Sequence, residues 1–338
     1  MMGGPLTIAC VGAGYWGRNL VRVFGGLSDV RLKVVCDSNA EVRQAMQQQY
    51  GDVRVEAQYE VVLKDSEVEA VVLAVPAIHH FSAAKAALAA GKHVYVEKPM
   101  TLDTAEAEEL VDVAQQQGRV LMVGHLLEYH PAVEMLKGLI EAGELGEIYY
   151  LYSQRVNLGI VRRDENALWS FAPHDLSVML HLLDQEPETV SARGECYLQE
   201  GVEDVVFVNL RFGDGKMAQL QLSWLDPHKI RKLTIVGSRK MAVFDDMESA
   251  EKVKIYDKAA ERRDYESYGD AITLRFGDVV MPHIDMVEPL KVECRHFAEC
   301  VREGKRPRSD GRDGLRVVKV LDAAQRSLER DGEPVALV

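Results

Sequence analysis

The fold is decided by residues 6–17, which read LTIACVGAGYWG. The apolar run at 6–11 is typical of a buried strand, and it ends in the pattern Gly-x-Gly-x-x-Gly, where helical spacing begins. Gly12 permits a tight turn, Gly14 lets the backbone approach a pyrophosphate, and Gly17 lets the helix pack closely on the strand. The N-terminus of that helix offers N–H groups to an anion. The stretch therefore predicts a dinucleotide site.

An acidic residue indicates which dinucleotide is bound. Asp37 ends a second apolar run, at 32–37, twenty residues after Gly17. A carboxylate there accepts hydrogen bonds from the adenosine ribose hydroxyls and repels a 2′-phosphate, so the predicted cofactor is NAD, with NADP less favoured. Residues beside these positions are expected to line the same site: Tyr15, Trp16 and Ser38.

Regular alternation predicts the rest of the N-terminal half. Apolar runs at 69–75, 93–96 and 119–123 alternate with helical patterns. This order indicates βαβ units, and runs without polar alternation fit a parallel sheet that is covered on both faces. A doubly wound Rossmann domain is therefore expected at residues 1–128.

The pattern changes after residue 128. Strands with period-2 alternation dominate, and the pair 206–212 and 218–224 reads as an antiparallel hairpin with one buried face. We expect an α+β domain with a large, mostly antiparallel sheet at 129–338, which makes the whole chain α/β in class. The terminal helices, within 289–330, are expected near the domain junction.

Composition excludes several classes of partner. The 338 residues carry a formal net charge of −13, which opposes binding to nucleic acid or to anionic lipid. The sequence lacks both an apolar run near the ~20 residues of a membrane span and a signal-peptide pattern. Five cysteines without a Cys-x-x-Cys pair predict no metal site. A cytoplasmic protein is expected.

Three motifs, in this order, resemble the Gfo/Idh/MocA oxidoreductase family. They are the glycine turn at 12–17, Pro76-Ala77-Ile78-His79-His80, and Glu97-Lys98-Pro99. The resemblance implies an NAD-dependent enzyme that acts on CH–OH groups. It places Pro76 and His80 beside the cofactor, although a purely structural His80 is an equal alternative, and it gives Glu97 a role in orienting Lys98 or in binding ribose.

Lys98 is the first catalytic candidate. It follows a parallel strand at the edge where ligands of doubly wound sheets bind, and the proline after it keeps the backbone extended. A lysine there can contact the cofactor, hydrogen-bond a substrate hydroxyl, and stabilise the alkoxide that forms as hydride leaves. The alternative, a surface charge at a strand end, is set aside because of the family resemblance.

His174 is the second catalytic candidate. Pro173 stands where helices often start, so His174 is expected in the first turn of a helix. The resemblance implies a general acid/base, and the unperturbed pKa of histidine, ~6.5, suits proton transfer. Many relatives carry Asp four residues earlier, where this chain has Ser170. This substitution leaves Asp175 as a neighbouring carboxylate and possible substrate contact.

A narrower resemblance concerns the substrate. Residues 124–131, 155–159 and 168–175 are similar to a family branch of sugar-nucleotide dehydrogenases from bacterial surface-polysaccharide biosynthesis. A sugar nucleotide needs cations for its diphosphate and polar groups for its ring. The candidates are Lys98, Arg155, Asn157, Arg163, His174 and Asp175, and the alternative for the arginines is a solvated loop.

Two rival functions remain open. One is an inositol or free-sugar dehydrogenase, which needs no cationic stretch near Arg155. The other is a non-catalytic dinucleotide-binding sensor. The serine at position 170 allows this alternative, whereas the presence of Lys98 and His174 argues against it. We also expect a homodimer or homotetramer through the C-terminal sheet, because both faces of the strand at 218–224 lack charge.

Overall fold

The structure is a computed structural model that describes residues 4–159, 161–163, 165–262 and 272–337. Contacts divide the chain into two compact units, which we describe separately. The first unit comprises residues 1–129 and 287–318, and the second comprises residues 130–286 and 319–338. The segment 287–318 thus packs with the Rossmann unit, whereas the residue pattern assigned it to the second domain.

The first unit contains a six-stranded parallel sheet in the order β3-β2-β1-β4-β5-β6. This is the strand order of a doubly wound dinucleotide-binding fold, as predicted. The strands are β1 (Leu6–Val11), β2 (Val30–Cys36), β3 (Arg54–Glu56), β4 (Ala70–Leu73), β5 (His93–Glu97) and β6 (Leu121–Gly124).

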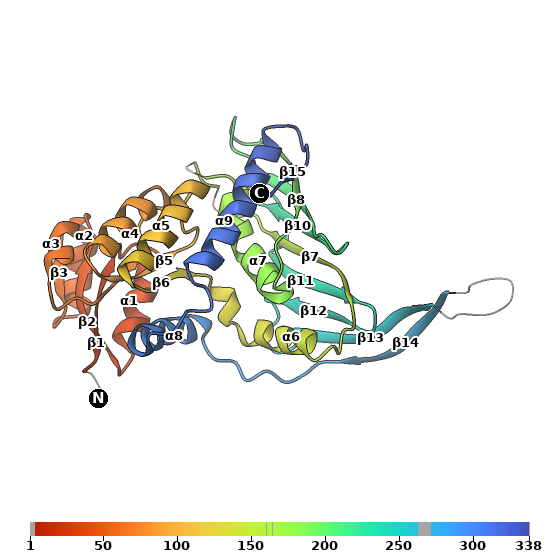
Figure 1. The fold of residues 1–338 in the computed structure, drawn as a ribbon, viewed down its shortest axis with the longest axis horizontal. Helices are drawn as coiled ribbons and strands as arrows, with labels where there is room; N and C mark the ends of the chain where they lie inside the picture. Colours follow the sequence, from red (N-terminus) through yellow and green to blue (C-terminus); the bar gives the residue numbers. More distant parts are fainter. Residues whose placement is uncertain (1–3, 160, 164, 263–271, 338) are drawn as a thin grey trace. The chain divides into compact units, whose positions relative to one another are not determined.

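Helices cover both faces of this sheet (Figure 1), which explains why β1, β4 and β6 are buried along their whole length. Helices α1 (Gly17–Gly25), α2 (Ala40–Gln49) and α8 (Pro289–Glu303) pack on one face, and α4 (His80–Ala89) and α5 (Thr104–Gln117) on the other. The remaining elements of this unit are α3 (Tyr59–Lys64), the 3₁₀ turns η1 (Ala77–His79) and η2 (Leu126–Tyr129), and the first residues of α9 (Gly311–Leu328).

Local chemistry sets the ends of these helices. The Asn39 side chain accepts hydrogen bonds from the backbone of the first turn of α2, and Asp103 does the same for α5. Gly118 ends α5 in the left-handed conformation. The sequence does not predict β3 or α3, because both are too short to show a periodic pattern of apolar residues.

The second unit contains a nine-stranded sheet in the order β14-β13-β12-β11-β7-β10-β9-β8-β15. Every pairing is antiparallel except that of β7 with β10. The strands are β7 (Ile148–Val156), β8 (Thr189–Glu195), β9 (Val205–Arg211), β10 (Met217–Ser223), β11 (Ile230–Gly237), β12 (Met241–Asp245), β13 (Val253–Arg262), β14 (Ile272–Val280) and β15 (Val335–Ala336).

Helices cover one face of this second sheet. Helix α7 (Ala167–Leu183) contacts β10, β7 and β9, and α6 (Pro131–Glu141) contacts α7 and β12. The predicted hairpin is confirmed, because β9 and β10 pair antiparallel with Val206, Val208 and Leu220 buried. In the described part of the chain, no helix combines the length and apolarity that a membrane crossing requires.

Candidate active site

The glycine turn has the backbone geometry that its sequence predicts. Gly12 has a φ of +83°, and a Cβ built on it would lie 2.6 Å from the Ala74 carbonyl oxygen. A Cβ on Gly17 would lie 1.9 Å from the Gly12 carbonyl oxygen, so the helix packs against the strand only without a side chain there. A Cβ on Gly14 would meet no protein atom within 4 Å. The open side of Gly14 fits the predicted approach of a pyrophosphate.

Asp37 lies at the carboxyl end of β2 and holds this turn. Its Oδ2 accepts the Ala13 N–H at 2.8 Å, and its Oδ1 accepts the Asn39 N–H at 2.8 Å. Each carboxylate oxygen has a second lone pair, which remains available to a ribose hydroxyl. Ser38, beside it, is exposed. The residues present therefore fit an NAD molecule.

The glycine turn is tied to the end of β5. The Trp16 indole donates to Glu97 Oε1 at 2.6 Å, and the Lys98 backbone N–H donates to Glu97 Oε2 at 3.3 Å. Burial raises the pKa of Glu97, while Trp16 and Lys98 oppose that rise. Tyr15 is 95% exposed. Trp16 thus supports the site through Glu97, whereas Tyr15 presents its whole ring outward.

Lys98 follows the carboxyl end of β5 and is half-buried. Gly12, Asp37 and Pro76 follow the carboxyl ends of β1, β2 and β4. Because these strands are parallel, the four positions lie at one edge of the sheet, around the switch point between β1 and β4. The first unit thus gathers the predicted cofactor residues and Lys98 at the edge where a dinucleotide binds.

The contacts of His80 fit the structural alternative of its prediction. Its side chain is buried, with Nδ1 2.7 Å from the Pro99 carbonyl oxygen and Nε2 2.9 Å from the Val75 carbonyl oxygen. Burial lowers the pKa of His80. Both ring nitrogens face backbone, so His80 holds together the segments that carry Pro76 and Lys98 and has no nitrogen left for a cofactor.

The second unit positions His174 on α7, but not in its first turn. The helix begins at Ala167, because Asn166 caps it by accepting the Trp169 N–H at 3.1 Å. Pro173 lies inside the helix rather than at its start. His174 is half-buried on α7, among residues that are otherwise mostly buried.

Arg155 and Asp175 form a buried ion pair. Arg155 donates from Nε to Asp175 Oδ2 at 2.6 Å and from Nη2 to Asp175 Oδ1 at 3.3 Å, and both side chains are 9% exposed. Each side chain is therefore paired with the other, and their contact with substrate stays a prediction. Their pairing fixes β7 to α7 next to His174.

The other substrate candidates lie after β7. Asn157 is half-buried, and its backbone N–H donates to the Ser223 carbonyl oxygen at 3.1 Å. Arg163 is exposed within the short described segment 161–163. Its neighbour Arg162 pairs with Glu165 at 2.9 Å. Asn157 and Arg163 therefore remain available candidates.

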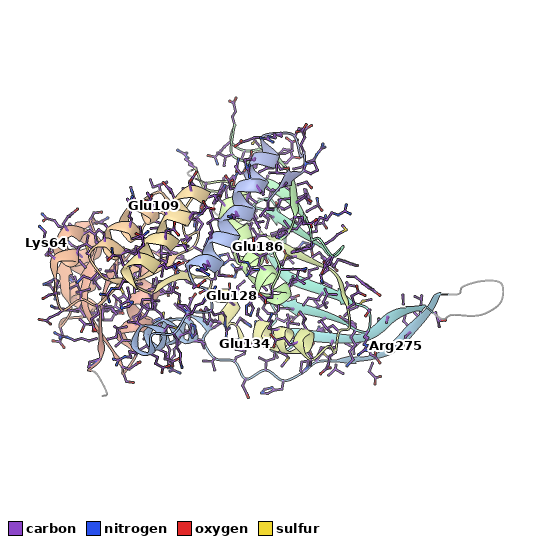
Figure 2. All side chains as sticks on the ribbon, viewed as in Figure 1. Lys64, Glu109, Glu128, Glu134, Glu186 and Arg275 are labelled. Atoms are coloured by element: carbon purple, nitrogen blue, oxygen red, sulfur yellow. The ribbon has the colours of Figure 1, made fainter. Side chains whose placement is uncertain are left out.

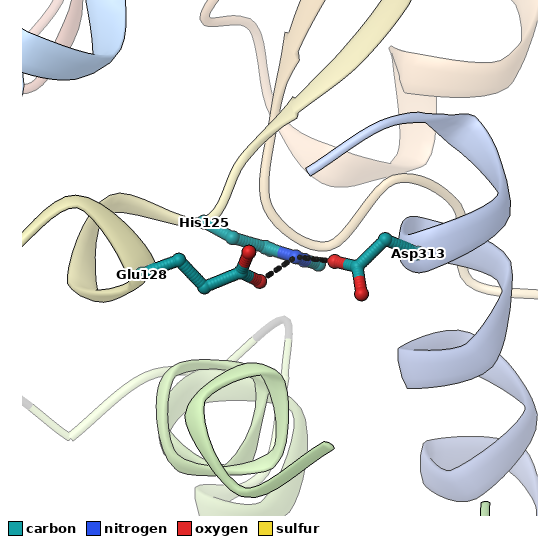
Figure 3. Close-up of side chains that lie close together, drawn as sticks. All are labelled: His125, Glu128 and Asp313. Atoms are coloured by element: carbon teal, nitrogen blue, oxygen red, sulfur yellow. Dashed lines mark hydrogen bonds and ion pairs between the residues drawn. The ribbon is translucent and has the colours of Figure 1, made fainter. Parts of the chain in front are cut away.

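A buried cluster in the first unit was not anticipated. His125 Nδ1 lies 2.9 Å from Asp313 Oδ2 and 3.3 Å from Glu128 Oε1 (Figure 3), at a spacing that a metal ion also accepts. The two carboxyl groups raise the pKa of His125 to about 10 despite its burial. Burial and Asp313 raise the pKa of Glu128 to about 8. An imidazolium that donates to Asp313 accounts for these contacts.

This cluster links distant parts of the first unit. Glu128 lies in the interior on η2, whereas Lys64 and Glu109 lie exposed on outer helices (Figure 2). Asp313 comes from the first turn of α9. In the sequence, this cluster shows locally as a histidine followed three residues later by a glutamate, and nothing nearby indicates the distant Asp313.

Two family models match the chain. The model described as an oxidoreductase family with an NAD-binding Rossmann fold matches residues 6–125. The model described as the GFO/IDH/MocA C-terminal domain matches residues 133–243. Together these models span most of both units.

Relatives and solved structures agree with the models. UDP-N-acetylglucosamine 3-dehydrogenase of Acidithiobacillus ferrooxidans is 31% identical over 70% of this chain and 72% of its own length. Its crystal structure has a TM-score of 0.81 over 96% of this chain and 98% of that chain, at 26% identity. Inositol 2-dehydrogenase of Salmonella paratyphi B is 28% identical over 55% of this chain and 56% of its length.

One structural neighbour holds the expected cofactor. GenD2 from gentamicin A biosynthesis, in complex with NAD, has a TM-score of 0.83 over 100% of this chain and 98% of that chain, at 24% identity. At 24% identity, this similarity shows a common fold.

Proposed function

The chain belongs to the Gfo/Idh/MocA family of NAD-binding oxidoreductases, and on that premise we propose that it oxidises a secondary alcohol of a nucleotide-linked sugar, or runs the reverse reduction. The observation that carries the proposal is the edge of the first sheet, where the glycine turn, Asp37 and Lys98 follow the ends of parallel strands. A 31% identical relative is named as a dehydrogenase of UDP-N-acetylglucosamine, which supports the choice of substrate class.

The chemistry divides between cofactor and side chains. NAD, held by the glycine turn and Asp37, would supply the hydride acceptor for the carbon that carries the hydroxyl. Lys98, as a cation at the sheet edge, hydrogen-bonds that hydroxyl and stabilises the alkoxide that develops as the hydride departs. His174 accepts the hydroxyl proton as general base and returns it in the reverse direction. Asn157 and Arg163 bind the sugar nucleotide, and the pair of Arg155 with Asp175 holds the His174 helix on β7.

The test compares two lysine variants. Lys98→Met removes the cation at the sheet edge, whereas Lys85→Met removes an exposed lysine that pairs with Glu109 on the helical face. We expect Lys98→Met to lose ~10²–10³-fold in kcat while binding NAD normally, since that is the loss typical when one donor that stabilises a developing oxyanion is removed. Lys85→Met should keep wild-type turnover. Near-normal turnover of Lys98→Met, with UDP-N-acetylglucosamine and NAD, would remove Lys98 from the mechanism.

A second candidate substrate class has a specific observation behind it. The 28% identical inositol 2-dehydrogenase implies that myo-inositol or a free sugar is the rival substrate. A panel of UDP- and dTDP-sugars against myo-inositol and glucose, followed by NADH absorbance, separates the two. Turnover of myo-inositol alone would replace the nucleotide-sugar assignment.

We also propose that the chain forms a homodimer or homotetramer through the second sheet. The face of β7 and β9 opposite the helices exposes aromatic side chains, with Tyr150 44%, Tyr152 36% and Phe207 43% exposed. Tyr150 and Tyr152 stack at 6.3 Å between ring centroids. Light scattering should give a multiple of the chain mass, and Tyr152→Glu should reduce it. A monomeric wild-type mass at micromolar concentration would contradict the proposal.

A further inference from the structure

A cavity of about 480 Å³ lies at the edge of the first sheet opposite to the predicted dinucleotide site, and every residue that lines it belongs to the first unit. His93 and Leu121, which begin β5 and β6, line it together with the end of α5, the loop after α8 and the start of α9. Because a strand rises ~3.3 Å per residue, the steps from His93 to Lys98 separate the cavity from the edge that carries Lys98 by about 16 Å. Its volume suits a small organic ligand.

The charged side chains that line this cavity are mainly cationic. Four of them are positive and one is negative, which gives 4 − 1 = +3 in a chain whose net charge is −13: Arg119, Lys305, Arg306, Arg312 and Asp310. Helices α5 and α8 end here and α9 begins here. Each helix end counts for about half a charge, so the dipoles together remove only about half a positive charge. The cavity therefore favours an anion.

Two of the four cations are paired with carboxylates. Arg306 donates to Asp310, with Nη2 3.2 Å from Oδ1, and Lys305 pairs with Glu303. The Asp310 side chain also accepts N–H groups from the first turn of α9, so the N-terminus of that helix is already capped. The positive charge that a ligand can use therefore comes from the other two cations, both of which are arginines.

The first of these arginines, Arg119, meets His93 as donor against donor. His93 Nδ1 accepts the Val120 backbone N–H at 3.0 Å, so this nitrogen carries no proton. An imidazole ring keeps a proton on at least one nitrogen, which is then Nε2. Arg119 Nη1 lies 3.3 Å from Nε2, and a guanidinium has only donors. Two N–H groups thus converge without an acceptor between them, and an anionic oxygen would accept from both.

The second arginine, Arg312, lies in the first turn of α9. Its Nη2 donates to Gln115 Oε1 at 3.4 Å, which is a long contact with a neutral group. Among the residues that the structure describes, neither Arg312 nor Arg119 takes part in an ion pair. Apolar side chains, including Val111 and Leu121, form another part of the cavity wall. The cavity thus combines two guanidinium groups that lack a carboxylate with a surface for an apolar group.

We propose that this cavity binds a small organic phosphate, with the phosphate on Arg119, Arg312 and His93 Nε2 and the organic part against Val111 and Leu121. A guanidinium can donate two parallel hydrogen bonds to a phosphate group. A phosphate ester carries about two negative charges at neutral pH, which matches two unpaired arginines better than the single charge of a carboxylate. The site is separate from the dinucleotide site and does not rest on the proposed function.

The experiment is a calorimetric titration of the full chain with phenyl phosphate, inorganic phosphate and benzoate, with NADH added to occupy the dinucleotide site. The variants are Arg119→Gln and Arg312→Gln, whose side chains are exposed. The matched control is Arg31→Gln on β2, which removes an exposed arginine that pairs with Glu67 at 3.4 Å. Melting temperatures check that each variant is folded, and NMR of ¹⁵N-labelled histidine follows the Nε2 signal of His93.

We expect phenyl phosphate to bind the wild type and to shift the His93 Nε2 signal. Each cavity variant should weaken this binding by about tenfold or more, the usual loss when a hydrogen bond to a charged group is removed, whereas Arg31→Gln should bind like wild type. Inorganic phosphate and benzoate should bind more weakly than phenyl phosphate.

Three results would overturn the proposal. They are absence of phenyl phosphate binding at millimolar concentration, equal binding by wild type and Arg119→Gln, and benzoate or inorganic phosphate binding as tightly as phenyl phosphate. None of these readouts needs turnover, so a failure of the proposed dehydrogenase activity is observed separately.

Discussion

The buried ion pair of the second unit yields the most quantitative prediction. Asp175→Asn keeps the shape of the side chain and removes the charge that compensates Arg155. Both side chains are 9% exposed, and Arg155 Nε lies 2.6 Å from Asp175 Oδ2. Breaking a buried pair by removing one partner leaves an uncompensated charge and costs ~3–5 kcal/mol. For a unit of this size, the melting temperature should fall by on the order of 10 °C.

Tryptophan fluorescence during urea unfolding is a suitable assay. Trp169 and Trp224 are buried in the second unit, whereas Trp16 of the first unit is 36% exposed. A Trp16→Phe background makes the signal specific to the second unit. In this background, the fluorescence midpoint should move to lower urea in Asp175→Asn than in the parent variant with Asp175 intact.

A double variant separates charge from packing. Arg155→Met/Asp175→Leu removes both charges, and replacement of a buried pair by apolar residues is often neutral or stabilising. We expect the double variant to be more stable than Asp175→Asn. The reasoning is refuted if Asp175→Asn unfolds like wild type and instead raises KM for the sugar nucleotide, because Asp175 would then contact substrate rather than Arg155.

Three further predictions concern the first unit. Asp37→Ser should weaken NAD binding by roughly tenfold, because the carboxylate accepts the Ala13 N–H that holds the glycine turn. The same change should reduce the ratio of NADP to NAD dissociation constants, because the carboxylate opposes a 2′-phosphate. Titration with both cofactors measures the two effects. Gly17→Ala should unfold at markedly lower temperature, since its Cβ would lie 1.9 Å from the Gly12 carbonyl oxygen. Asp313 and Glu128 raise the pKa of His125 to about 10, above the ordinary histidine value of ~6.5. The stabilisation that this histidine contributes is therefore complete below the ordinary value and lost as pH rises through the raised one. Calorimetry should show this decline in wild type and a flatter profile in His125→Gln, and equal profiles would contradict the charge assignment.

Five of the six strands of the parallel sheet can be predicted from the sequence, because each lies in a short, largely apolar run that ends near a glycine, proline or aspartate. The exception is β3, which reads Arg-Val-Glu. Asp103 and Asn39 cap their helices through local hydrogen bonds, which sequence displays directly. The predicted start of α7 near Pro173 is wrong, and the reason is local. Pro173 resembles a first-turn proline, yet Asn166 begins the helix earlier and the proline lies within it.

Long-range pairs were beyond the reach of residue patterns. Asp313 is 188 residues from His125, and no periodicity connects them. The sequence predicts that Arg155 binds a diphosphate, because it is cationic and lies in a segment, 155–159, that resembles sugar-nucleotide dehydrogenases. Its alternation with the buried Leu151 and Ser153 was the available sign that it points into the interior. The sequence leaves His80 open between a cofactor contact and a structural role, because its partners are backbone carbonyls, which sequence does not display.

The central claim is that this chain transfers a hydride from a nucleotide-linked sugar to NAD. The most direct measurement is mass spectrometry of the cofactor after incubation with UDP-N-acetylglucosamine deuterated on its ring carbons, which succeeds whether or not NAD leaves the protein. We predict deuterium on the reduced nicotinamide with the wild type and a loss of that label with Lys98→Met. Bound NAD that gains no deuterium from this substrate, from myo-inositol or from glucose would contradict the claim and favour a dinucleotide-binding sensor.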